Sequence, residues 1–370
     1  ATIGVSCTDL NPGTYRIKGK FVTNPEETVY LVDDIIGRED TLGQTTFKNN
    51  EFNIEGEVDG VRAASLVVDG VRIPVLLENE WFKVKLDPFN LNSECLFEKG
   101  GGEQMLLNHY FEVCAAIQAK KELFMQDYYK ARFYRDSVLL RKTEADLESN
   151  REEIQTTVDE LIRQYPDTYM SAYLLYIWRN DLSATPERLE TRYELLGKKA
   201  RQYAPAKIVK ESIDNFNRMQ IGNVAPDFTL TTPEGKPLGL KQLEGNVKII
   251  NFLLSQNEQS RVENLSMTRL YQKYKNDGLN ILSISVDDNI EAWLKAIEDD
   301  GMTWNQVRGE EGWYSPILDK YVVRKYPYTV VLDENNQIVA MDIYGDDLLA
   351  KVKEKIAELD HWTNKQETKA

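Results

Sequence analysis

The sequence predicts a multidomain chain with an all-β N-terminal domain at residues 8–99, an α-helical connector domain at 100–220 and an α/β domain at 221–370. In the first part, short runs alternate apolar and polar residues, as half-buried strands do. In the second, apolar residues recur every three or four positions, which is typical of amphipathic helices. In the third, nearly continuous apolar runs alternate with helical patterns, which favours a largely parallel sheet covered by helices.

The N-terminal part is expected to form a small antiparallel sandwich or barrel, because its strands are short and closely spaced. Asp69-Gly70 lies between two apolar runs and predicts a two-residue hairpin turn. Asn49-Asn50 is a second turn dipeptide. The expected strands cover residues 15–21, 28–32, 52–54, 65–68, 71–77 and 81–86.

The connector domain begins after Gly100-Gly-Gly102, which lacks the Lys-Ser/Thr of a phosphate-binding loop and is interpreted as a flexible joint. Pro186 follows a plausible N-cap and predicts a helix over 187–203. Four aromatic residues of this part are interpreted as core rather than as a ligand cage. They are Tyr169, Tyr173, Tyr176 and Trp178.

The C-terminal part reads as β-α-β-α followed by β-β-α. Residues 247–254 and 279–286 are apolar enough to be strands buried on both faces. A hairpin is expected around Glu334-Asn-Asn-Gln337, and crossover connections in such a sheet are right-handed. The remaining strands are expected at 328–332 and 338–343, and the helices at 261–276, 290–299 and 346–359.

The composition excludes several classes of function. The net charge of −15 argues against nucleic acid as a partner, because binding replaces phosphate counterions with Lys and Arg. No apolar run approaches the roughly 18 residues of a membrane span. The two histidines, His109 and His361, are too few and too far apart to indicate a His-based catalytic or metal site. We therefore expect no cofactor and no metal.

The three cysteines show neither a CxxC spacing nor a zinc pattern. Cys95 and Cys114 are interpreted as small buried hydrophobic residues, with a Cys95–Cys114 disulfide as the alternative. Cys7 follows a short apolar stretch and a small residue, as at the end of a bacterial lipoprotein signal, which predicts lipidation of Cys7. The alternative is an ordinary cysteine close to the start of the sequenced segment.

The motifs of the C-terminal part resemble the thioredoxin fold. Ala225–Gly235 looks like the first strand of envelope thiol–disulfide oxidoreductases and of the peroxiredoxin (thiol-specific antioxidant) superfamily. Asn251-Phe252 precedes the active-site loop in those families, and Gly312-Trp313 and Tyr326–Asp333 match their approach to the cis-proline and the hairpin. This thioredoxin-like resemblance covers residues 221–359.

The N-terminal part, with its helical connector, resembles an uncharacterised domain often placed before such thioredoxin domains in Gram-negative envelope proteins. The resemblance implies a location in the cell envelope of a Gram-negative bacterium, in the periplasm or as a membrane-anchored lipoprotein. It adds support for lipidation of Cys7, which would be the chain's contact with a membrane.

By alignment with the family's Cys-x-x-Cys motif, the two cysteine positions hold Asn257 and Ser260. Thiol–disulfide exchange needs a thiolate at the first position and a resolving thiol at the second, so the site is degenerate. Ser260 as a hydrolytic nucleophile would need a base, and no histidine is at hand. Glu263 matches the family's acidic residue, unless it only favours the first helical turn. Pro327 occupies the cis-proline position, and either completes the turn or retains peptide binding.

These observations predict a non-catalytic thioredoxin-fold envelope protein used for binding or scaffolding, with an unknown protein or peptide partner. The alternative is a thiol–disulfide oxidoreductase or antioxidant-type enzyme. That alternative would act through Cys95 or Cys114, brought to the Asn257 loop from another domain.

Overall fold

The computed structural model describes residues 13–21, 28–35, 40–87, 95–179, 186–309, 312 and 315–367. They form two compact units. Unit 1 comprises the described residues up to Arg179 together with Glu187–Val209, and unit 2 comprises Pro186 and the described residues from Lys210 onward. The three predicted domain boundaries stay predictions. None of the described helices is both long enough and apolar enough to cross a membrane.

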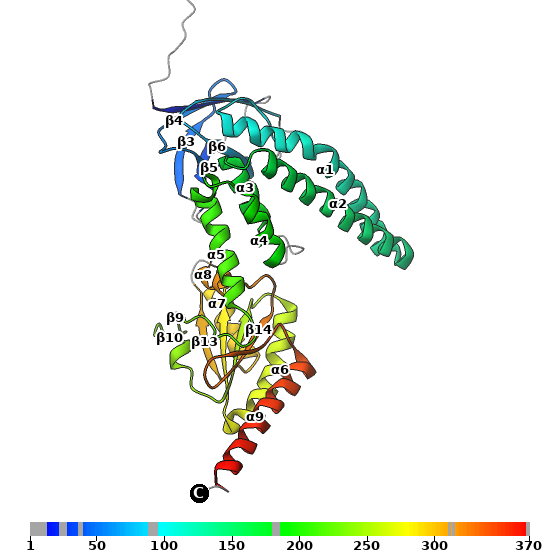
Figure 1. Cartoon of the computed structure of the whole chain (residues 1–370), viewed down its shortest axis with the longest axis vertical. Helices are drawn as coiled ribbons and strands as arrows, with labels where there is room; N and C mark the ends of the chain where they lie inside the picture. The colour runs from blue at the N-terminus through cyan, green and yellow to red at the C-terminus, as the bar shows by residue number, and fades with distance from the viewer. Residues whose placement is uncertain are drawn as a thin grey trace, which may run out of the picture. The chain divides into compact units, whose positions relative to one another are not determined.

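Unit 1 contains a β-sandwich of two four-stranded sheets, in the orders β4-β1-β7-β8 and β3-β2-β5-β6 (Figure 1). Pairing is antiparallel as predicted, except that β1 and β7 run parallel. At the predicted hairpin, Asp69 and Gly70 have φ angles of +51° and +72°. The strands are β1 Tyr15–Phe21, β2 Thr28–Asp33, β3 Thr41–Thr46, β4 Glu51–Gly56, β5 Arg62–Val68, β6 Val71–Leu77, β7 Trp81–Leu86 and β8 Phe97–Lys99.

The sandwich core forms because alternate residues of each strand point inward. Ile17 and Phe82 from one sheet pack in the same cluster as Leu31, Leu66 and Ile73 from the other. Each is fully buried, and burial of such a side chain contributes roughly 1.5–3 kcal/mol.

The helices of unit 1 pack on this sandwich through α1, whose Gln104 accepts a hydrogen bond from the backbone N–H of Leu76, and through α3, whose tyrosines are core residues as predicted. The Tyr169 hydroxyl accepts a 3.0 Å hydrogen bond from the backbone N–H of Ala63, and the Tyr173 hydroxyl donates to Asp34 at 3.0 Å. The helix predicted over 187–203 ends early, at Leu195. The helices are α1 Gly102–Tyr134, α2 Ser137–Gln164, α3 Tyr169–Trp178, α4 Pro186–Leu195 and α5 Ala204–Arg218, whose residues from Lys210 onward belong to unit 2.

The glycine run before α1 is not the flexible joint that was predicted. A Cβ atom at Gly101 would lie 2.0 Å from a carboxylate oxygen of Glu78. The same carboxylate accepts a 2.9 Å hydrogen bond from the backbone N–H of Glu103 in the first turn of α1. The glycines therefore allow a close-packed helix start.

Unit 2 is built on a seven-stranded sheet in the order β10-β9-β13-β12-β11-β14-β15. β11 is parallel to β12 and antiparallel to β14, which in turn pairs with β15. This confirms that the strands predicted near 247–254, 279–286 and 328–343 share one sheet. The strands are β9 Thr229–Thr231, β10 Pro237–Gly239, β11 Val247–Leu253, β12 Leu279–Ser285, β13 Asn305–Arg308, β14 Tyr328–Asp333 and β15 Ile338–Met341.

Each face of this sheet has its own core. Ile249 of β11 packs with Met267 of α6 and Val352 of α9, whereas its neighbour Ile250 packs on the opposite face with Tyr321. Both faces of β11 are buried, as its nearly continuous apolar run predicted. The helices are α6 Glu258–Tyr274, α7 Ile290–Asp299, α8 Pro316–Lys320 and α9 Gly345–Glu367. The all-β, helical and α/β parts of the predicted fold class are thus confirmed.

Candidate functional site

The candidate site lies where β11 ends and α6 begins. The predicted helix start at residue 261 is too late, because α6 begins at Glu258 with Asn257 as its N-cap. The Asn257 side-chain oxygen accepts a 2.8 Å hydrogen bond from the backbone N–H of Ser260. An N-cap asparagine satisfies one of the N–H groups that the first turn leaves without a helical partner. Asn257 therefore has a structural role at the first aligned cysteine position.

Ser260, at the second aligned position, is fully buried. Its hydroxyl lies 3.5 Å from the backbone nitrogen of Leu254, and this is the one hydrogen bond of that hydroxyl within the described part of the chain. A buried serine without a paired base is not an activated nucleophile. The geometry thus gives no support to hydrolysis at Ser260.

A carboxylate that sequence reasoning missed fixes the loop between β11 and α6. Asp287, which follows β12, is only 5% exposed. It accepts hydrogen bonds from the backbone N–H of Ser255 at 3.0 Å and from the Ser255 hydroxyl at 2.8 Å. The Ser285 hydroxyl donates to it at 2.7 Å. The carboxyl ends of adjacent parallel strands meet at one edge of a sheet, so the order of β11 and β12 was a usable signal.

The cis-proline loop is formed as the resemblance implies, since the Tyr326–Pro327 peptide bond is cis. The Tyr344 hydroxyl donates a 2.8 Å hydrogen bond to the Pro327 carbonyl. Burial, and to a lesser degree the negative charge of Asp287, raise the pKa of the Tyr326 phenol. Phe252 near the end of β11 pairs with Tyr328 at the start of β14, so the loop lies at the same edge of the sheet as Ser255 and Asp287.

Glu263 lies in the second turn of α6, which begins at Glu258. It therefore does not serve the first helical turn, which was the alternative interpretation of this residue. Its side chain is buried, and its carboxylate accepts a 3.3 Å hydrogen bond from the backbone N–H of Gly345, the first residue of α9. Burial raises the pKa of this carboxyl group, and the Gly345 hydrogen bond opposes that shift only in part. Glu263 thus links two helices on one face of the sheet.

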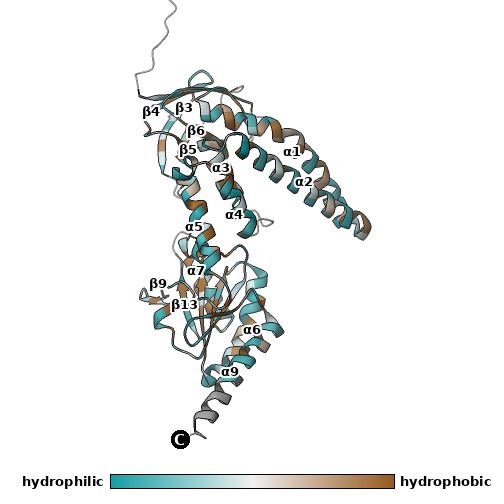
Figure 2. Ribbon diagram, viewed as in Figure 1, coloured by the Kyte–Doolittle hydropathy of each residue, from teal (hydrophilic) through white to brown (hydrophobic). Residues whose placement is uncertain are grey.

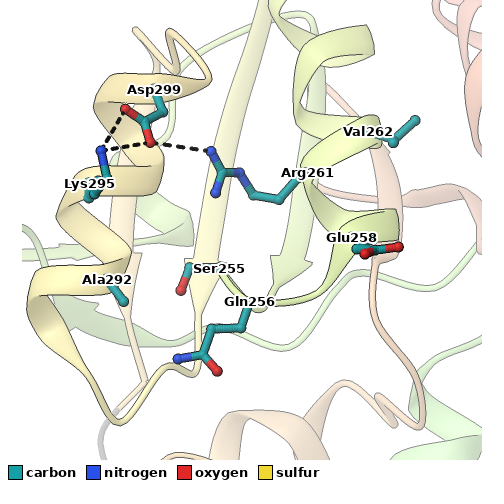
Figure 3. Close-up of a pocket in the computed structure, with 8 residues that line it drawn as sticks. All are labelled: Ser255, Gln256, Glu258, Arg261, Val262, Ala292, Lys295 and Asp299. Carbon is teal, nitrogen blue, oxygen red and sulfur yellow. Dashed lines mark hydrogen bonds and ion pairs between the residues drawn. The ribbon is translucent and has the colours of Figure 1, made fainter.

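A hollow of about 700 Å³ opens beside the start of α6 (Figure 3). The cations around it are already paired. Arg261 binds the Asp300 carboxylate through two 2.7 Å hydrogen bonds, and Lys295 lies 3.1 Å from Asp299. These carboxylates raise the pKa of Arg261. The lining residues are Ser255, Gln256, Glu258, Arg261, Val262, Ala292, Lys295 and Asp299.

The cysteines of the oxidoreductase alternative both belong to unit 1. Cys114 is buried on α1, and Cys95 is partly buried against the sandwich core. Both carry thiols, so the alternative Cys95–Cys114 disulfide is not formed in the structure. Cys7, the predicted lipidation site, lies outside the described residues. The described residues contain no group of three or more His, Cys, Asp or Glu side chains able to hold a metal ion.

Comparison with known proteins gives matches for both ends of the chain. Residues 221–344 match the AhpC/TSA family, and residues 15–107 match a domain of unknown function, DUF4369. Thiol-disulfide oxidoreductase ResA of Bacillus anthracis is 30% identical over 122 residues, covering 33% of this chain and 69% of that protein. ResA of Halalkalibacterium halodurans is 26% identical over 124 residues, covering 34% and 69%.

Among solved structures, the thioredoxin domain of a thiol-disulfide oxidoreductase from Bacteroides vulgatus is 29% identical, with a TM-score of 0.36. The match covers 37% of this chain and 98% of that one. A thiol-disulfide oxidoreductase from Bacteroides fragilis is 31% identical with a TM-score of 0.34, covering 36% and 98%.

Proposed function

We propose that this chain, which belongs to the thioredoxin-fold thiol–disulfide oxidoreductase family, performs no thiol–disulfide exchange itself and instead binds a protein or peptide partner. One observation carries the proposal. The side chains at the two aligned cysteine positions are engaged in the helix start, Asn257 as its cap and Ser260 as a buried residue. Exchange proceeds by thiolate attack through a mixed disulfide, and neither residue has a sulfur atom.

Reduction of insulin disulfides by the purified full chain tests the catalytic part of the proposal. With dithiothreitol as the electron donor, we expect no rate above the buffer control. The double variant Asn257→Cys with Ser260→Cys serves as the positive control. Insulin reduction by the wild-type protein would contradict the proposal. If that activity were lost in Cys95→Ala or Cys114→Ala, the oxidoreductase alternative would be established instead.

Apolar side chains around the site support a binding role. Val262 and Leu265 on α6, and Ile290 and Leu294 on α7, are all exposed to solvent. Val262 also lines the hollow together with Ala292. Exposed apolar residues beside a hollow with a polar rim are typical of protein and peptide binding sites.

A photo-crosslinking side chain at Gln256 tests where the partner binds. Gln256 is exposed and lines the hollow. Asn335 is the matched control, because Val247 of β11 pairs with Asp333 and the Asn335 turn therefore lies at the opposite end of the sheet. We expect crosslinked species from Gln256 in intact cells and none from Asn335. Equal crosslinking at both positions would contradict binding at this site.

We also propose that the protein works in the cell envelope, anchored by a lipid on Cys7. The support is the sequence around Cys7 and the resemblance of the N-terminal part to domains of envelope proteins. The full-length protein should then partition with membranes, and Cys7→Ala should release it. Full-length protein that stays in the supernatant with an unmodified Cys7 would contradict this.

A further inference from the structure

The hairpin formed by α1 and α2 is longer than its packing in unit 1 requires. At 1.5 Å per residue, the 33 residues of α1 extend about 50 Å. Apart from Ala131 and Thr143, the buried residues of α1 run from Gln104 to Ile117 and those of α2 from Asn150 onward. Between them, in residues 118–149, only Ala131 and Thr143 are buried. The distal half of the hairpin therefore has almost no core of its own.

The free end of the hairpin exposes its largest apolar side chains. Phe133, Tyr134 and Val138 are 81%, 76% and 70% exposed, the three highest values for large apolar residues in the described chain. Tyr129 is 62% exposed and lies one turn from Phe133. Figure 2 shows hydrophobic residues in brown at this end of the hairpin. Such a cluster on a projecting element indicates a surface that becomes covered.

The same segment concentrates positive charge in an acidic protein. Residues 128–142, here called the hairpin tip, contain five basic residues and one acidic residue, a net charge of +4. One of the five, Lys130, is paired with Asp127, just before the tip, at 3.0 Å. The acidic residue, Asp136, caps α2 by accepting from the backbone N–H groups of Val138 and Leu139. Arg135, Arg141 and Lys142 are exposed, and none of them forms an ion pair with another described residue.

We propose that the hairpin tip binds the surface of an anionic lipid bilayer. Tyr and Phe rings at the tip would enter the boundary between headgroups and acyl chains, while the Arg and Lys side chains reach lipid phosphates. Each basic residue near such a surface is attracted to it, and the attraction decreases with salt. The inference is independent of the proposed function of unit 2.

The charge along α2 favours an end-on approach. Residues 143–164 contain seven acidic and two basic residues, and this stretch extends about 33 Å at 1.5 Å per residue. The Debye length at physiological salt is about 8 Å. Most of the acidic stretch would therefore lie beyond the range at which the bilayer repels it, whereas the tip is in contact.

A second copy of the chain is a less suitable binding partner for the hairpin tip. A symmetric contact between two copies would place the same surface on both sides, and two tips of charge +4 would repel each other. The charge complementarity is with an anionic surface, and the mixture of exposed aromatic rings and basic residues matches the interface of a bilayer.

Flotation with lipid vesicles tests the proposal on the full chain carrying Cys7→Ser, so that a lipid at Cys7 cannot supply the binding. We expect binding to vesicles with about 30% phosphatidylglycerol and not to pure phosphatidylcholine, because the tip is cationic. Binding should fall when salt rises from about 0.1 M to about 0.5 M. The variant Arg135→Glu with Arg141→Glu should bind at least about tenfold more weakly, and Phe133→Ser with Tyr134→Ser should also weaken binding.

The matched control is Lys198→Glu with Lys199→Glu, which makes the same charge change at exposed residues elsewhere in unit 1. It should retain the wild-type partition. All variants change exposed side chains, and circular dichroism checks that they fold. Absence of binding to anionic vesicles would overturn the proposal, as would an equal loss in the control. A concentration-dependent dimer that the tip variants abolish, without lipid binding, would assign the tip to a second copy instead.

Discussion

The amide oxygen of Asn257 lies 2.8 Å from the backbone nitrogen of Ser260, so the two positions that we predict to align with the family's cysteines are joined to each other as a helix cap. A thiol is a weak hydrogen-bond acceptor and would cap poorly. With Asn257 as the N-cap, the start of α6 is stabilised by a side-chain hydrogen bond. This relationship allows the site to be tested through stability as well as through activity.

Asn257→Ala should destabilise the protein by about 1 kcal/mol, the usual cost of losing a side-chain N-cap. The free energy of unfolding, measured by urea denaturation of the full chain, checks this. Asn257→Asp is the control, because it keeps the acceptor and adds a negative charge that the helix N-terminus favours. An alanine variant as stable as the wild type would show that the cap contributes nothing.

Asp287→Ala should be more costly, at about 3 kcal/mol or more. It leaves the buried donors of Ser255 and Ser285 without their acceptor, and hydrogen bonds to charged groups contribute roughly 1.5–3 kcal/mol each. The neighbouring Asp288→Ala is the matched control, because Asp288 is exposed. Equal losses of stability in the two variants would refute the role assigned to Asp287.

The parts of unit 2 that the sequence predicted are those in which burial determines the pattern. The apolar runs of β11 and β12 could be recognised because both of their faces are covered. In unit 1, the Asp69-Gly70 turn could be predicted for a different reason, since a tight hairpin needs residues that tolerate positive φ.

Contacts between segments that are far apart in the chain could not be predicted from the sequence. The packing of Glu78 against Gly101, which excludes a flexible joint, depends on strand β6 ending beside the start of α1. The parallel pairing of β1 with β7 depends on how the sandwich closes. The cap at Asn257 could have been predicted from the sequence, because an Asn before a helical pattern is a typical N-cap.

Glu263 should make stability fall as pH rises. Burial raises the pKa of its carboxyl group above the ordinary value of 4.5, so the folded state binds this proton more tightly than the unfolded state does. The folded protein is then favoured below the unfolded pKa, and this advantage is lost as pH increases from about 4.5 through the folded pKa. Urea denaturation between pH 4 and pH 8 measures the slope.

Glu263→Gln should remove that slope, so the variant gains stability over the wild type as pH increases. Glu258→Gln is the control in the same helix, because Glu258 is exposed and lies in the first turn of α6. Loss of the Glu258 charge should destabilise the protein modestly, the opposite sign, since a negative charge at a helix N-terminus is favourable. A Glu263→Gln profile parallel to that of the wild type would contradict the assignment.

Restoring both sulfurs should restore chemistry at a cost in stability. In Asn257→Cys with Ser260→Cys, the first thiol would replace the N-cap and the second would be buried as Ser260 is. A helix N-terminus stabilises a thiolate, so the pKa of the first thiol should lie below the ordinary 8.5 or so. We expect insulin reduction above the wild-type level, and a reduced form less stable than the wild type by about 1 kcal/mol because the cap is lost.

The single variants separate these effects. Asn257→Cys alone should form mixed disulfides without turnover because it has no resolving thiol, and Ser260→Cys alone should be inert because its thiol is buried. Alkylation rates between pH 5 and pH 9 report the thiol pKa, and circular dichroism confirms folding. A folded double variant with a lowered thiol pKa but no turnover would show that the missing sulfurs are not what prevents catalysis. The cause would then lie in the surroundings of α6, where the hollow is neutralised by the Arg261–Asp300 and Lys295–Asp299 pairs.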